Sequence, residues 1–156
     1  MPKHVELKFC TDMCYAVKDI ANKMLVMAED GGELMTNMKL QKMLYYQQGF
    51  HLAYFGSPLF EEDLEAWMYG PVVPGVYAAY KEFGKNGLMG DHEHVVSLED
   101  KEEALFAEVM RVYSKYSAIG LMNMTHEEMP WKTTPVGEGN VIAKEKMMEF
   151  FKTRLA

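Results

Sequence analysis

Hydrophobic positions recur at helical spacing along most of the chain, and the stretches that carry them begin near capping residues or prolines. In the stretch that opens at Thr36, the apolar positions cover more than a narrow stripe, so we expect a central helix with contacts on two sides. The pattern predicts about five to six helices, over residues 11–28, 36–55, 74–83, 97–116, 117–124 and 141–154.

Alternation of apolar and polar residues indicates only a minor β element. Residues 64–68 are predicted to form a short strand, and the polar loop at 91–97 holds a second candidate strand that could pair with the first as a small ribbon. Residues 1–10 favour a strand or a loose arm. With no repeat or internal boundary, the sequence predicts a mainly α fold, α+β with a two-stranded β element, in a single compact domain spanning 1–156.

A glycine-proline corner interrupts this helical pattern. The residues before Pro71 and Pro74 are pushed away from the α region, so residues 69–73 should be extended. Pro74 suits the first position of a helix, which Gly84 would end. The large aromatic residues beside the turn are interpreted as anchors that pack the corner on a core.

Composition and charge narrow the classes of function. The formal charge of −7 and the pI near 5.2 disfavour nucleic-acid binding, and Arg111 and Arg154 are the only arginines. No leader or membrane-spanning segment is recognisable, so we expect a cytoplasmic protein without membrane contact. Cys10 and Cys14 are expected to be reduced.

Three sets of polar residues are candidates for chemistry. Lys39 and Lys42 are spaced to share a helix face that could meet an acidic partner, although solvated lysines are the simpler reading. The histidines around Glu93 diverge too much for a metal site, and the two cysteines have no companion ligands. His126 beside Glu127 could act as a base. A buried His126 that pins a short helix over Trp131 is the favoured interpretation.

Three motifs together resemble a known family, the SocA-like or Panacea-domain proteins. They are the segment 40–46, the stretch Glu65-Ala66-Trp67 with Gly70-Pro71-Val72-Val73-Pro74 and Tyr77, and Thr125-His126 with Pro130-Trp131. Met43 stands where the family usually has leucine. The resemblance implies an antitoxin of a bacterial toxin–antitoxin pair, often on prophages and other mobile elements. It also implies that the partner is a protein toxin and that the chain has no set of catalytic residues. A family member can in addition act as an adaptor that delivers its toxin to a cytosolic ATP-dependent protease, which would be a second partner.

The sequence is therefore expected to encode a non-enzymatic type II antitoxin that neutralises its cognate toxin by direct binding, without metal or cofactor. The alternatives are a proteolytic adaptor or protein-binding regulator without a toxin, and a hydrolase that uses His126 and Glu127. Toxin identity, contact surface and oligomeric state stay open. Candidate partner-binding residues are Lys39, Lys42, Tyr46, Tyr69 and Tyr77, and expected structural residues are Leu40, Gln41, Tyr45, Trp67, Gly70, Pro71, Pro74, His126, Pro130 and Trp131.

Overall fold

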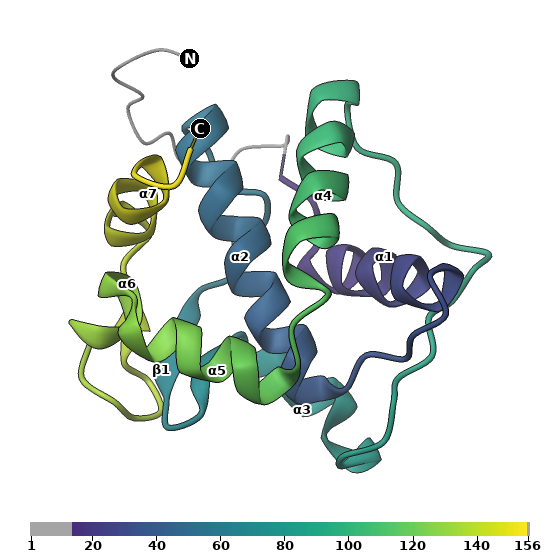
Figure 1. Cartoon of the computed structure of the whole chain (residues 1–156), viewed down its shortest axis with the longest axis horizontal. Coiled ribbons are helices and arrows are strands. Elements are labelled where there is room, and N and C mark those ends of the chain that lie inside the picture. The colour runs from purple at the N-terminus through teal and green to yellow at the C-terminus, as the bar shows by residue number, and fades with distance from the viewer. Residues whose placement is uncertain (1–13, 156) are drawn as a thin grey trace.

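Helix α2, Asn37–Phe55, runs through the middle of the molecule (Figure 1). The side chain of Thr36 accepts a hydrogen bond from the backbone N–H of Lys39, and Gly56 ends the helix with a φ of 73°. Nearly every residue of α2 is buried, which confirms the predicted central helix and extends its contacts beyond the two sides expected.

The other elements surround α2 in a computed structural model that describes residues 14–155. They confirm a mainly α fold. In chain order they are α1 Val17–Asp30, β1 Leu64–Trp67, β2 Gly70–Val72, α3 Pro74–Tyr80, a 3-10 turn Lys81–Phe83, α4 Asp100–Tyr113, α5 Ala118–Glu127, α6 Met129–Lys132, β3 Val141–Ile142 and α7 Lys144–Lys152.

The three strands form one antiparallel sheet in the order β2-β1-β3. Glu65 on β1 pairs with Val72 of β2 and with Val141 of β3. The predicted ribbon between 64–68 and 91–97 is wrong, because residues 91–97 hydrogen-bond instead to side chains of α1. Lys23 Nζ, for example, donates to the Val96 carbonyl at 2.7 Å.

Several predicted boundaries differ from the observed ones. Within the described residues α1 begins at Val17. The start predicted at residue 11 lies outside this part of the chain, as does the arm at 1–10. Helix α4 is capped by Glu99 with Glu102. The last helix begins at Lys144, because Val141 and Ile142 join the sheet. Cys14 is disulfide-bonded, which contradicts the reduced thiol expected there; Cys10 lies outside the described residues.

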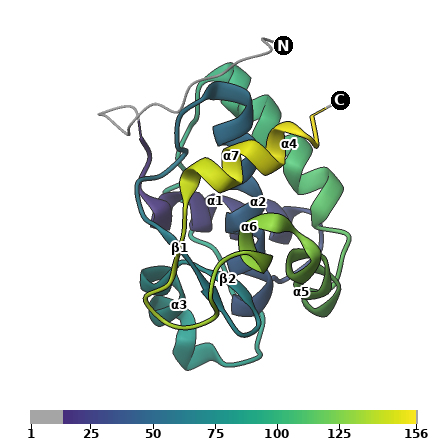
Figure 2. The same ribbon diagram turned by 90° about the vertical axis from the view of Figure 1, so that its left-hand side faces the viewer.

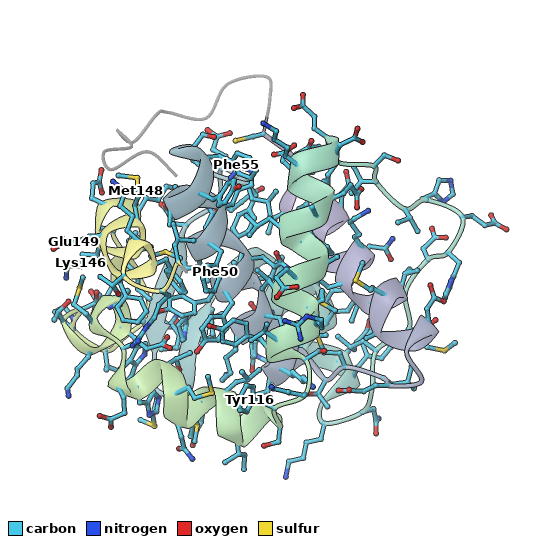
Figure 3. All side chains as sticks on the ribbon, turned by 45° about the horizontal axis from the view of Figure 1, so that its top comes forward. Phe50, Phe55, Tyr116, Lys146, Met148 and Glu149 are labelled. Atoms are coloured by element: carbon cyan, nitrogen blue, oxygen red, sulfur yellow. The ribbon has the colours of Figure 1, made fainter. Side chains whose placement is uncertain are left out.

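Aromatic rings join α2 to α7, which lies across it (Figure 2). Phe151 of α7 meets the rings of Tyr45 at 5.2 Å and Phe50 at 4.8 Å between centroids. A Cβ on Gly49 would lie 2.1 Å from the Phe151 ring, so only glycine allows this approach. In Figure 3 the labelled Phe50 lies between α2 and α4, whereas Lys146 and Glu149 lie on the side of α7 away from α2.

Candidate functional site

The three sequence motifs meet at the hairpin corner, defined here as residues 64–74, which includes β1, β2 and the turn between them. Gln41 is 1% exposed, and its Oε1 accepts a hydrogen bond from the Val73 N–H at 2.9 Å. Its amide donates to Asn37 Oδ1, and Asn37 in turn donates to the Tyr77 carbonyl at 3.1 Å. The first turn of α2 therefore holds both the corner and the following helix in place.

The third motif holds the corner from its other side. Trp131 Nε1 donates to the Trp67 carbonyl at 2.9 Å, which attaches α6 to the end of β1. Trp67 Nε1 donates to Glu65 Oε1 at 3.0 Å, and the same oxygen accepts from the Gly139 N–H. The Trp67 ring also packs edge-on against Tyr77 at 5.2 Å. The corner is thus fixed by hydrogen bonds from segments far apart in sequence.

Gly70 allows the corner to lie directly on α2 and α5. Its φ is +114°, a region that L side chains rarely adopt. A Cβ there would lie 3.1 Å from both Lys42 Cε and Thr125 Oγ1. Each of the three motifs therefore supplies one residue to this contact.

The turn at the end of the corner carries the exposed apolar tip, defined here as Met68 and Tyr69. Their exposed fractions are 66% and 60%, although the strands on both sides are largely buried. Two adjacent large apolar side chains thus stand exposed on a turn whose flanking residues are held by hydrogen bonds from α2 and α6.

A half-buried carboxylate lies at the junction between α5 and α6, where it contacts α2. Glu128 accepts hydrogen bonds from the hydroxyls of Tyr45 at 3.1 Å and Tyr46 at 3.0 Å. Burial raises the pKa of Glu128 to about 7, against the lowering effect of these hydroxyls and of the Arg154 charge. Burial also raises the pKa of Tyr113, whose ring stacks on Tyr46, to about 12.

The histidine motif has a geometry suited to packing. The His126 ring stacks on Trp131 at 4.0 Å between centroids, and its Nε2 is buried without a hydrogen-bond partner among the described residues. The side chain of Glu127 is 80% exposed and lies 3.7 Å from Lys132 Nζ. The two residues of the hydrolase alternative therefore face different surroundings.

The five predicted partner-binding residues do not lie on one surface. Lys39, Lys42 and Tyr46 are at most 5% exposed, so the expected exposed lysine face is absent from the folded chain. Lys39 Nζ contacts Glu33 Oε1 at 2.6 Å and the Ser114 carbonyl at 2.5 Å. Tyr69 is exposed and Tyr77 is half-buried. Both belong to the hairpin corner or to the helix beside it.

The residues expected to be structural mostly lie in the interior. Leu40, Gln41, Tyr45, Gly70, Pro71 and Pro130 are buried, whereas Trp67, Pro74, His126 and Trp131 are half-buried. The sequence reasoning missed Asn37, Glu65 and Glu128 as members of this network. Glu65 lies within a motif and could have been noticed, but no local signal marks Glu128, whose partners lie 82 and 83 positions away.

The described part of the chain has neither a cluster of metal-binding side chains nor a membrane-spanning helix. Residues 14–155 contain no group of three or more His, Cys, Asp or Glu side chains suited to a metal ion. His92 and His94 bind separate carboxylates, those of Glu29 and Asp91. None of the described helices is long and apolar enough to cross a membrane.

Comparison with known proteins identifies relatives of the chain. Residues 40–132, which contain all three motifs, match the family described as "Antitoxin SocA-like, Panacea domain". Antitoxin SocA of Caulobacter vibrioides (strain NA1000 / CB15N) is 27% identical over 132 residues, covering 77% of this chain and 70% of that protein. No solved structure gives a significant match. Because the matched region covers more than half of its length, the chain belongs to the SocA-like, Panacea-domain antitoxin family.

Proposed function

We propose that this protein is a type II antitoxin that neutralises a cognate protein toxin by direct binding through the exposed apolar tip. The observation that carries the proposal is the bracing of that tip: all three motifs of the antitoxin family hold the corner on which Met68 and Tyr69 stand. Tyr77, which packs on Trp67, extends the proposed contact surface along α3.

Net charge also supports this function. A charge of −7 favours encounter with a basic protein, because opposite charges accelerate association. Such a partner would lie in the cytosol, where we place the antitoxin. The apolar tip would then supply affinity after encounter, since buried aromatic residues contribute much of the free energy of typical interfaces.

Co-expression with the product of the neighbouring gene tests this proposal. The neighbouring protein should arrest growth alone, and this antitoxin should restore growth. Tyr69→Ala should abolish the rescue, whereas Tyr54→Ala, a matched control with 44% exposure near the far end of α2, should preserve it. Persistent arrest in the presence of the wild-type protein, or equal rescue by both variants, would contradict the proposal.

Two alternative functions give different outcomes in related assays. A proteolytic adaptor would change the half-life of its partner without any growth arrest to relieve. A hydrolase would lose activity in His126→Gln while the melting temperature stayed nearly unchanged. Because His126 stacks on Trp131, we instead expect this variant to lose stability.

A further inference from the structure

Three lysines of the described chain are buried, and Lys42 is the one whose ammonium group contacts no carboxylate. Lys23 Nζ contacts Glu103 Oε1 at 2.9 Å, and Lys39 Nζ contacts Glu33 Oε1 at 2.6 Å. Lys42 is 1% exposed, yet the hydrogen bond of its Nζ goes to the Met38 carbonyl at 3.2 Å. Among residues 14–155 no carboxylate forms an ion pair with it. The charge of this ammonium group is therefore uncompensated.

The position of Lys42 places this charge beside Gly70, the residue that directly follows the exposed apolar tip. Side chains on a helix lean toward its N-terminus, and Lys42 Nζ reaches back to Met38, which is 36% exposed. On its other side the nitrogen lies 3.4 Å from the position that a Cβ on Gly70 would occupy. Gly70 and the Met38 carbonyl therefore flank one buried ammonium group.

An uncompensated buried cation is costly, and a carboxylate brought by a partner would lower that cost. A partner that packs on Met68 and Tyr69 would cover the turn immediately above the nitrogen. Its contact would also exclude water and so strengthen the attraction between opposite charges. Charge complementarity therefore indicates which side chain the partner should bring to this place.

We propose that the ammonium group of Lys42 receives an aspartate or glutamate side chain of the toxin, which enters beside the Tyr69–Gly70 peptide when the toxin packs on the exposed apolar tip. The inference rests on the proposed function and specifies the chemistry of the partner at that surface. Lys42 is thus a contact residue that stays covered until the toxin binds, and the toxin needs an acidic residue next to an apolar pocket.

Calorimetric titration of the full-length protein with the purified product of the neighbouring gene tests the inference. Lys42→Met, which keeps an unbranched side chain but removes the charge, should weaken binding by at least tenfold while the melting temperature stays equal or rises. Lys39→Met is the matched control, because Glu33 already compensates that charge, and its affinity should stay within about threefold of wild type. Unchanged affinity in Lys42→Met would overturn the inference.

Proton uptake gives a second readout that a purely structural lysine would not move. Burial lowers the pKa of Lys42 to about 8, so an arriving carboxylate should draw a proton onto the amine. At pH 8 the wild type should take up about half a proton more per complex than Lys42→Met, measured in buffers of different ionisation enthalpy. Equal uptake would contradict the inference, whereas a wild-type protein that binds nothing would contradict the proposed function itself.

Discussion

Trp131 Nε1 donates a hydrogen bond to the main-chain oxygen of Trp67 across 2.9 Å, although 64 positions separate the two residues in sequence. This bond joins α6 to the end of β1, one residue before the exposed apolar tip begins. The tip therefore has a fixed neighbour on each side, Trp131 on one and Gln41 on the other. Its rigidity depends on tertiary contacts more than on the turn itself.

Replacement of Trp131 by Phe should test the contribution of this bond. The Phe ring can still stack on His126, but the Trp67 carbonyl loses its indole donor. We expect a loss of about 1–3 kcal/mol in the free energy of unfolding, measured by urea denaturation. Tyr54→Phe, at an exposed position, is the control and should change stability by less than about 0.5 kcal/mol. Equal stability of both variants would show that the bond contributes nothing.

Two glycine substitutions should act in opposite directions. Gly49→Ala places a Cβ 2.1 Å from the Phe151 ring, so overpacking should cost about 1–3 kcal/mol despite the better helix propensity of alanine. Gly75→Ala, within α3, meets nothing within 4 Å and should stabilise the fold by about 0.4–1 kcal/mol. Thermal unfolding monitored by circular dichroism measures both. A neutral Gly49→Ala would mean that α7 does not pack this closely on α2.

Glu128 should make stability depend on pH. Burial raises its pKa from 4.5 to about 7, so its stabilising contribution is complete below about pH 4.5 and is lost as the pH rises through about 7. Glu128→Gln removes this loss and should gain about 3 kcal/mol relative to wild type between pH 4 and 8.5. Denaturation at the two pH values measures the difference.

Glu127→Gln is the control for that experiment. The Glu127 side chain is 80% exposed, so its replacement should change the free energy of unfolding by less than about 1 kcal/mol. A gain in Glu128→Gln that stayed constant with pH would contradict the assignment of the Glu128 carboxyl as the titrating group.

Local signals in the sequence predicted the parts of the fold that depend on local interactions. Thr36 and Ser117 cap helices where expected, and Pro74 begins α3. The third strand could not be predicted, because β3 has only two residues and pairs with β1 more than 70 positions away. The spacing of Lys39 and Lys42 indicates a shared face but not its burial.

For the candidate site, too, the sequence predicted the residues of local motifs but not the contacts between distant segments. The sequence motifs identified the residues that brace the hairpin corner, including Gln41, Gly70 and Trp131. They did not reveal that Lys42 ends beside Gly70, which depends on how β2 packs on α2. The exposure of Met68 and Tyr69 is likewise a tertiary property.

A binding isotherm between this protein and the purified product of the neighbouring gene tests the central claim most directly. Direct neutralisation predicts a saturable complex, and Tyr69→Ala should weaken it by about 30-fold while Tyr54→Ala leaves it unchanged. Relief of growth arrest without any detectable complex between the two proteins would contradict the claim.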